Sequence, residues 1–423
     1  MKNEPTLVVS DKKGRIYDLP PFAACGMEGG NFLRLSPRDL IKIPYGSELF
    51  TLPERIPVGY DRRNDVFTAM KDFFAVSAFL SPGYTITHNS AYVEAGSPDT
   101  LPLFAYGAVA FYKNEFYAAA RRVDRELRQD LRFMDMGLLH KNVKRFRKLY
   151  PKNRLIRHLE SCALTYGCPA AKNFFLERYE GPLPTSPYCN AYCLGCISQQ
   201  PAGGCSVTQP RIKFIPTPEE IAETALHHIK AVKDPVVSFG QGCEGEPLLE
   251  GETIEKAIRM IRSVTSKGII NMNTNASLPK VLSRLFDAGL DSIRVSLNSV
   301  REESYERYYK PKGYSYKDVV GSIKVANTKK AFVSLNYLVM PGFSDSFIEF
   351  NALRNFLHIC KVDMIQWRNL NYDPVRYFKV LKADFQTSEL IGMRQLILSV
   401  NKEFPHLVSG YFNPSKRRIS YYK

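Results

Sequence analysis

The chain has 423 residues, of which 44% are hydrophobic and 24% charged, and this composition excludes a disordered or collagen-like protein. Lys and Arg number 58 against 42 Asp and Glu, so the net charge is +16 and the surface attracts polyanions. No segment approaches the roughly 18 to 20 apolar residues of a membrane span. The first residues also lack the apolar core of a signal peptide. We therefore expect a cytoplasmic protein without a membrane partner, in which cysteines serve as metal ligands or core residues more often than as disulfides.

Short strands separated by turns are predicted at the start of the chain. Residues 7–10 and 15–19 flank a Lys-Lys-Gly turn. Residues 105–112 and 116–123 flank Lys-Asn-Glu and form a plausible hairpin. Proline and glycine interrupt the sequence between them. We expect a β-rich N-terminal domain over residues 1–125.

Residues 126–180 have a helical pattern and a concentrated positive charge. Between Lys141 and Arg157 the chain has eight basic residues and no acidic one. One interpretation is a solvated helix face. The other is a surface for nucleic-acid phosphates, with Phe146, Tyr150 and the tyrosines of the C-terminal tail as stacking partners. We favour the first, because no recognised RNA-binding module occurs in the chain.

From residue 181 the sequence alternates between apolar strands and amphipathic helices. Thr217-Pro218-Glu219-Glu220 is a capping box with proline at the first helical position. Five clear strands are predicted, at residues 236–239, 269–274, 292–297, 332–339 and 363–368. A sixth, weaker strand is predicted before Cys189. The helices between them are predicted from residue 218, at 253–266, from a cap at Ser277 to 288, across 301–329, and before residue 363.

Such alternation indicates a parallel sheet with right-handed crossovers. Six strand–helix units predict an α/β fold whose core, over residues 181–375, is a (β/α)6 partial TIM-type barrel. It follows the β-rich domain and the basic helical segment. Residues 376–423 are expected to form a helix near 388–401 and a basic aromatic tail.

The sharpest local pattern is Cys189-x3-Cys193-x2-Cys196, three thiols within eight residues. A loop of this kind can surround one face of a [4Fe-4S] cubane, and three cysteines leave one of the four irons without a protein ligand. The alternatives are a zinc site with its fourth ligand elsewhere, or three buried thiols. Zinc sites favour paired cysteines separated by a longer gap, and no second close pair follows here.

These three cysteines match the CxxxCxxC signature of radical SAM enzymes, and the resemblance continues over residues 185–375. Residues 237–249, which include Gly-Cys-Glu-Gly-Glu-Pro-Leu-Leu, resemble the family's Gly-Glu-Pro segment after the second strand. Residues 273–276, 293–299 and 336–342 resemble its third, fourth and fifth strand ends. The shared order of these segments carries the resemblance.

The resemblance implies a [4Fe-4S] cluster, held by Cys189, Cys193 and Cys196, that binds S-adenosylmethionine and cleaves it to a 5′-deoxyadenosyl radical. It implies cofactor contacts from residues at the strand ends, namely Gly245, Glu246, Asn275, Ser296, Asn298 and Met340. Gly245 admits a close backbone approach, and Glu246 faces the ammonium group of the cofactor. The family's aromatic residue before the third cysteine is here Gly195, so Leu194, Ile197 or Tyr192 replaces it, or the adenine is held differently.

The other cysteines are Cys25, Cys162, Cys168, Cys205, Cys243 and Cys360. Cys162, Cys168, Cys205 and Cys243 could bind a second cluster, but we interpret them as small buried thiols. His227 and His228 are interpreted as surface or packing residues. Trp367 either lines the substrate pocket or belongs to the core.

We therefore predict a radical SAM enzyme that abstracts a hydrogen atom from a peptide, a protein or a small molecule. A ferredoxin or flavodoxin is the type of electron donor that the family implies. No catalytic residue or substrate is identified from the sequence. The alternatives are a radical SAM enzyme that modifies RNA and, outside the class, a zinc-stabilised nucleic-acid-binding protein.

Overall fold

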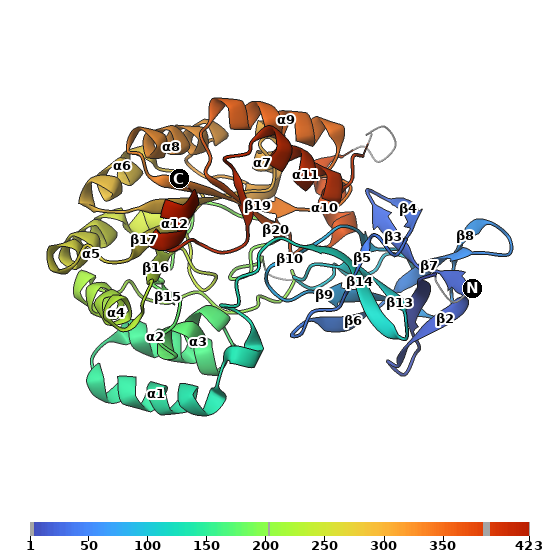
Figure 1. Cartoon of the computed structure of the whole chain (residues 1–423), viewed down its shortest axis with the longest axis horizontal. Helices are drawn as coiled ribbons and strands as arrows, with labels where there is room; N and C mark the ends of the chain where they lie inside the picture. The colour runs from blue at the N-terminus through green and yellow to red at the C-terminus, as the bar shows by residue number, and fades with distance from the viewer. Residues whose placement is uncertain (1–3, 202–203, 384–389, 423) are drawn as a thin grey trace.

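The computed structural model of the chain describes residues 4–201, 204–383 and 390–422. Within them, one largely antiparallel sheet belongs to the N-terminal part and one parallel sheet to the C-terminal part. In Figure 1 the antiparallel sheet, in blue and cyan, lies to one side of the curled parallel sheet and its helices. Helices α1, α2 and α3 lie below the parallel sheet in the same view.

The N-terminal sheet has 14 strands. Its strands are β1 (Thr6–Ser10), β2 (Ile16–Ala23), β3 (Cys25–Glu28), β4 (Asn31–Arg34), β5 (Leu40–Lys42), β6 (Glu48–Leu52), β7 (Arg55–Asp61), β8 (Val66–Ala69), β9 (Phe74–Phe79), β10 (Tyr84–Ile86), β11 (Asn89–Ser90), β12 (Tyr92–Glu94), β13 (Gly107–Tyr112) and β14 (Glu115–Arg122). Both hairpins expected here are confirmed, since β1 pairs with β2 and β13 with β14 in antiparallel register. Lys113 and Asn114 adopt φ angles of 49° and 61° in the second turn.

Three helices follow: α1 (Met136–Leu149), α2 (Arg154–Leu164) and α3 (Pro169–Phe175). Asp135 and Asn153 cap α1 and α2 by accepting a backbone N–H with their side chains. Together these helices enclose a small apolar core that includes Phe146. The expectation that Phe146 and Tyr150 could stack on bases is wrong for Phe146, which is 0% exposed. Tyr150 is half-buried, with its hydroxyl 2.6 Å from Nδ1 of His227.

The basic segment is partly neutralised by carboxylates of its own surroundings. Arg145 pairs with Glu177, Arg147 and Arg157 with Glu160, and Arg154 with Glu220. The four lysines of the segment are Lys141, Lys144, Lys148 and Lys152. They are exposed, and none forms an ion pair within the part of the chain that the structure describes. This arrangement is that of a solvated helix surface.

The parallel sheet confirms the expected partial barrel but has seven strands rather than six. In spatial order they are β15 (Glu180–Pro182), β16 (Val236–Phe239), β17 (Ile269–Thr274), β18 (Ser292–Leu297), β19 (Phe332–Val339), β20 (Met364–Asn369) and β21 (Val408–Gly410). The weak strand expected before Cys189 is β15. The unexpected seventh strand, β21, pairs in parallel with β20 from Met364↔Val408 to Gln366↔Gly410. Three residues are too few to show a period of two, which is why the sequence did not reveal it.

Helices connect these strands and cover the outside of the sheet (Figure 1). They are α4 (Pro218–Ala231), α5 (Gly251–Val264), α6 (Pro279–Ala288), α7 (Glu302–Tyr309), α8 (Tyr316–Thr328), α9 (Phe347–Ile359), α10 (Pro374–Leu381) and α11 (Met393–Glu403), with the short 3₁₀ helix η2 (Pro247–Glu250). Helix α12 (Lys416–Tyr422) follows the last strand, and a second 3₁₀ helix, η1 (Leu131–Phe133), precedes α1. The predicted capping box of α4 is present in full. The cap predicted at Ser277 is wrong: α6 begins after Leu278 without a side-chain cap. The start of the predicted helix at 388 lies outside the described residues.

The N-terminal sheet is bound to the C-terminal ends of β19 and β20. The Asn369 side chain accepts from the N–H of Ile86 at 2.9 Å and donates to the carbonyl of Tyr84 at 3.1 Å. Arg55 and Asp373 form an ion pair at 3.2 Å in which both side chains are buried. The antiparallel sheet therefore covers part of the edge where parallel α/β barrels place their active sites. Among the described residues, no helix is long and apolar enough to cross a membrane.

Candidate active site

The three cysteines of the predicted cluster lie on one loop, residues 189–196, which we call the cysteine loop. Its backbone is bound to the end of α7 and the residues that follow. Tyr192 N–H donates to the Tyr309 carbonyl at 2.8 Å, and Leu194 N–H donates to the Tyr308 carbonyl at 3.1 Å. Lys312 N–H donates to the carbonyl of Asn190 at 2.8 Å. These bonds hold the loop against the end of α7.

The three thiols are not grouped as closely as the ligands of one metal ion would be. The sulfur atoms of Cys189, Cys193 and Cys196 do not all lie within 4.8 Å of one another, although another set of donors in the described residues does. Ligands of a cubane each bind a different iron and are therefore farther apart than ligands of one ion. All three side chains are partly buried, which suits a cluster that needs one open side.

The thiols differ in acidity because their surroundings differ. Burial raises the pKa of Cys189 to about 11 and that of Cys193 further. At Cys196 burial also raises the pKa, but hydrogen bonds from Ser198 and the charge of Arg211 outweigh it and the net shift is downward. Arg211 Nη2 lies 3.6 Å from the Cys196 sulfur. A cation beside the loop stabilises the thiolates that an iron cluster requires.

Gly245 and Glu246 lie directly against the cysteine loop. Gly245 N–H donates to Ser186 O at 2.7 Å, and Glu246 N–H donates to Tyr188 O at 2.8 Å. A Cβ atom on Gly245 would lie 1.8 Å from the carbonyl oxygen of Tyr188, so only glycine fits. This close approach is to the chain itself, and the predicted approach of the Gly245 backbone to a ligand stays a prediction.

The Glu246 carboxylate is buried and binds the turn after β17. It accepts from the backbone N–H of Leu248 at 3.1 Å and of Asn275 at 2.8 Å, and from the hydroxyl of Thr274. Burial raises its pKa to about 7 despite these donors. A carboxylate has about four acceptor positions, so one remains for a further donor such as an amino group.

Two residues that the sequence analysis did not select hold the site together. The Asn190 side chain accepts from Asn275 Nδ2 at 2.7 Å and donates to the Ser277 hydroxyl at 2.9 Å. The buried Glu244 carboxylate accepts from the backbone N–H groups of Thr185 at 2.8 Å and Ser186 at 3.0 Å. Asn190 thus links the cysteine loop to the turn after β17, and Glu244 links two loops. Asn190 lies within the cysteine motif itself, which was the available signal.

The remaining predicted cofactor contacts have different surroundings. Ser296 is half-buried, and its hydroxyl accepts from Asn336 Nδ2 at 3.1 Å. Asn298 is 0% exposed and donates to Ser304 O at 3.2 Å and Tyr377 Oη at 3.1 Å. Its Oδ1 has no partner in the described chain. Met340 is buried, and its sulfur accepts from Asn89 of the N-terminal sheet at 3.6 Å. Contact of these residues with the cofactor stays a prediction.

The unusual Gly195 has a steric explanation. A Cβ atom there would lie 2.9 Å from both the Asn371 carbonyl oxygen and the Tyr308 hydroxyl. An aromatic side chain at this position therefore has no room. Of the proposed substitutes, Leu194 is buried and Tyr192 is 49% exposed, with the Lys312 ammonium 4.0 Å from its ring centre.

The inward face of the sheet is polar and carries two half-buried cations. Arg294 of β18 donates to Gln366 at 3.2 Å, and its Nε has no partner among the described residues. Burial, and then the charge of Arg368, lowers the pKa of Arg294 to about 9. Arg368 donates to the Tyr411 carbonyl at 3.1 Å. Within the described chain neither arginine has a carboxylate oxygen within 4.0 Å. Charged and polar residues alternate with apolar ones along residues 292–297, a signal that the sequence analysis did not use.

The tail completes this polar interior. Asn413, which follows β21, donates to Glu180 at 2.7 Å and to Asn273 at 3.2 Å, and it accepts from Gln366 at 3.1 Å. Three strands and the tail are thus joined through one amide. We missed Asn413 because its partners come from distant parts of the sequence.

Three further predictions can be compared with the structure. Trp367 is 0% exposed and donates to the Ser409 hydroxyl at 2.9 Å, so it belongs to the core. His228 is buried, which lowers its pKa to about 4, and His227 lies 2.9 Å from Glu177, so both are packing residues. Cys205 donates to the Leu101 carbonyl at 3.2 Å.

Parts of the chain are similar to known proteins. Residues 183–352 match the family model of the Radical SAM superfamily. Molybdenum cofactor biosynthesis protein 1 of Bos taurus is 26% identical over 221 residues, covering 52% of this chain and 31% of that protein. GTP 3′,8-cyclase of Lactiplantibacillus plantarum is 25% identical over 192 residues, covering 44% of this chain and 52% of that protein. The chain thus spans about a third to a half of these relatives.

A solved structure, Streptococcus suis SuiB bound to S-adenosylmethionine, aligns with a TM-score of 0.37 and 15% identity over 73% of this chain and 70% of that one. The matched family segment contains the cysteine loop, the Gly245–Glu246 turn and strands β16 to β19. Residues 183–352 of this chain therefore form a radical SAM domain, and enzymes of that superfamily use a [4Fe-4S] cluster and S-adenosylmethionine.

Proposed function

We propose that Cys189, Cys193 and Cys196 hold the [4Fe-4S] cluster and that the neighbouring strand ends hold S-adenosylmethionine. The observation that carries this proposal is the hydrogen bonding of the cysteine loop and the residue before it to the Gly245–Glu246 turn and to the turn after β17. Glu246 N–H donates to the carbonyl of Tyr188, directly before the loop, and Asn275 donates to Asn190 within it, so the loop and both turns are held together. When bound, the cluster and cofactor supply the electron transfer and the carbon radical.

The chain's own residues have distinct tasks in this proposal. Glu246 uses its remaining acceptor position for the amino group of the cofactor, and burial keeps water from competing for it. The N-terminal sheet covers the adjoining edge of the barrel, with Asn89 donating to the Pro341 carbonyl at 3.2 Å. Tyr305, Tyr308 and Tyr309 form a buried aromatic wall beside the cysteine loop and exclude water from it.

The substrate, in our proposal, is a small molecule or a peptide with an anionic group rather than RNA. Arg294 and Arg368 support this, because half-buried cations without a carboxylate within 4.0 Å among the described residues are suited to bind a carboxylate or phosphate. The relatives named GTP 3′,8-cyclase make a nucleoside triphosphate the first substrate to test. The hydrogen atom is taken from a carbon of this molecule.

The reaction also needs an electron donor, for which we propose a ferredoxin or flavodoxin. We propose that the enzyme itself is cytoplasmic, since all nine of its cysteines are free and a reducing compartment keeps thiols free.

The deciding experiment measures 5′-deoxyadenosine and methionine after anaerobic reduction of the purified protein with S-adenosylmethionine. The wild type should contain about four irons at this site. It should form both products, and should do so slowly when no substrate is added. The variant with Cys189, Cys193 and Cys196 all replaced by Ala should lose both. Zinc in place of iron, with no cleavage under a strong reductant, would falsify the proposal.

The substrate class is tested separately with Arg294→Gln and Arg368→Gln, using the exposed Arg259→Gln as the matched control. We expect both interior variants to raise KM for an anionic substrate and to leave basal cofactor cleavage intact. An equal effect of Arg259→Gln would contradict the assignment.

A further inference from the structure

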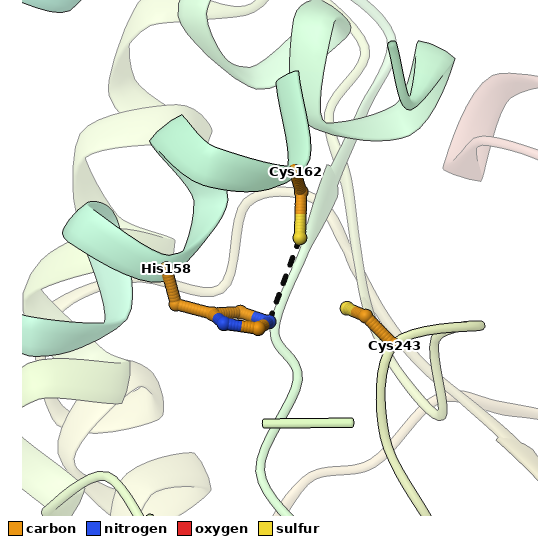
Figure 2. Close-up of side chains that lie close together, drawn as sticks. All are labelled: His158, Cys162 and Cys243. Carbon is orange, nitrogen blue, oxygen red and sulfur yellow. Dashed lines mark hydrogen bonds between the residues drawn. The ribbon is translucent and has the colours of Figure 1, made fainter. Parts of the chain in front are cut away.

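A second group of side chains that can bind a metal ion, one histidine and two cysteines, lies outside the cysteine loop. His158 and Cys162 are four residues apart on α2 and therefore on one face of that helix. Cys243 comes from the loop that follows β16. Figure 2 shows the three side chains pointing toward a common centre from these two elements. Their ligand atoms all lie within 4.8 Å of one another, the one such group of three among the described residues.

The distances suit a single tetrahedral ion. The Cys162 sulfur and His158 Nε2 are 3.5 Å apart. Zinc binds sulfur at about 2.3 Å and imidazole nitrogen at about 2.0–2.1 Å, so two such ligands of one tetrahedral ion are about 3.5 Å apart. The separation of these two atoms in the protein is thus that of two zinc ligands.

We propose that His158, Cys162 and Cys243 bind a zinc ion. Two thiolates and one imidazole form a ligand set typical of zinc. A second iron–sulfur cubane is disfavoured, because its ligands bind different irons and need wider spacing than this group has. The proposal is independent of the radical reaction and replaces the interpretation of Cys162 and Cys243 as ordinary core thiols.

The environment of the group supports metal binding. Cys162 and Cys243 are 2% and 3% exposed and border the apolar core of α1, α2 and α3. Cys168 interacts electrostatically with both thiols.

The site would tie α2 to the loop of the proposed cofactor site. Cys243 directly precedes Glu244, Gly245 and Glu246, and its carbonyl accepts from Ile212 N–H at 2.8 Å. An ion at Cys243 would hold the start of this loop on the helical segment. Zinc loss is therefore expected to loosen Glu246 without removing any ligand of the iron cluster.

The test is metal analysis of the full-length holoenzyme by mass spectrometry, with zinc and iron counted in the same sample. We expect about one zinc per chain beside the cluster iron, as a single-ion site implies. Zinc-edge X-ray absorption, which iron does not disturb, should show sulfur and imidazole nitrogen ligands. Cys162→Ser, Cys243→Ser and His158→Gln should each lose at least tenfold in zinc affinity and keep the iron content.

Cys360→Ser is the matched control, because Cys360 is a buried thiol far from this group in the sequence and should keep both metals. If a serine variant fails to fold, the absorption spectrum of the wild type still decides. Absence of zinc after expression with added zinc, zinc with oxygen ligands alone, or loss of iron in the Cys243→Ser variant would overturn the proposal. A Cys162–Cys243 disulfide in anaerobically prepared protein would also overturn it.

Discussion

Replacing Gly245 by Ala tests the contact between the cofactor turn and the cysteine loop. The added Cβ would lie 1.8 Å from Tyr188 O and 3.1 Å from Cys189 N, both of them backbone atoms. Separation of the two segments would break the hydrogen bonds from Gly245 N–H and Glu246 N–H. Overpacking costs about 1–3 kcal/mol and each lost bond about 0.5–1.5 kcal/mol, so we expect a loss of about 2–6 kcal/mol in the free energy of unfolding.

The displacement also moves Cys189, so the Gly245→Ala variant should retain less iron when treated with a chelator. Gly321→Ala is the control, because its Cβ meets a single atom, Pro279 Cγ at 3.8 Å, inside helix α8. That change should stabilise the protein by about 0.5–1 kcal/mol through helix propensity. The assays are anaerobic denaturant unfolding and iron content. Wild-type stability and iron in the Gly245→Ala variant would refute the close approach described here.

Three further outcomes are expected. Cofactor affinity should rise about tenfold from pH 6 to 8, because the pKa of Glu246 is about 7 and the ionised carboxylate is the form that binds an amino group; calorimetry should show weaker, pH-independent binding for Glu246→Gln. Asn190→Ala should lose about 1–3 kcal/mol of stability and release iron faster to a chelator, and unchanged release would mean that its two hydrogen bonds do not hold the loop. The variant with Lys144, Arg145 and Lys148 all changed to Glu should bind RNA less tightly yet turn over S-adenosylmethionine as the wild type does; RNA-dependent turnover that the variant loses would contradict our choice of substrate class.

The sequence predicted those parts of the fold that have strong local signals. The strand ranges 236–239, 269–274, 292–297 and 332–339 agree with the structure because apolar runs between capped helices are distinctive. The short β21 gave no such signal. Among the candidate site residues, Gly245 and Glu246 followed from a motif. Asn190, Arg294 and Asn413 depend on partners far away in the chain, and only the folded arrangement brings these together.

The place of β21 in the sequence has a consequence for folding during synthesis. The ribosome makes this strand and Asn413 after the other six strands of the parallel sheet. Until they emerge, β20 has a free edge, and Glu180 and Gln366 lack the amide that joins them. A nascent half-barrel with an open strand edge is a template for wrong pairing. We therefore expect the N-terminal sheet to become protease-resistant on stalled ribosomes first, while the parallel sheet becomes resistant when the tail has left the exit tunnel.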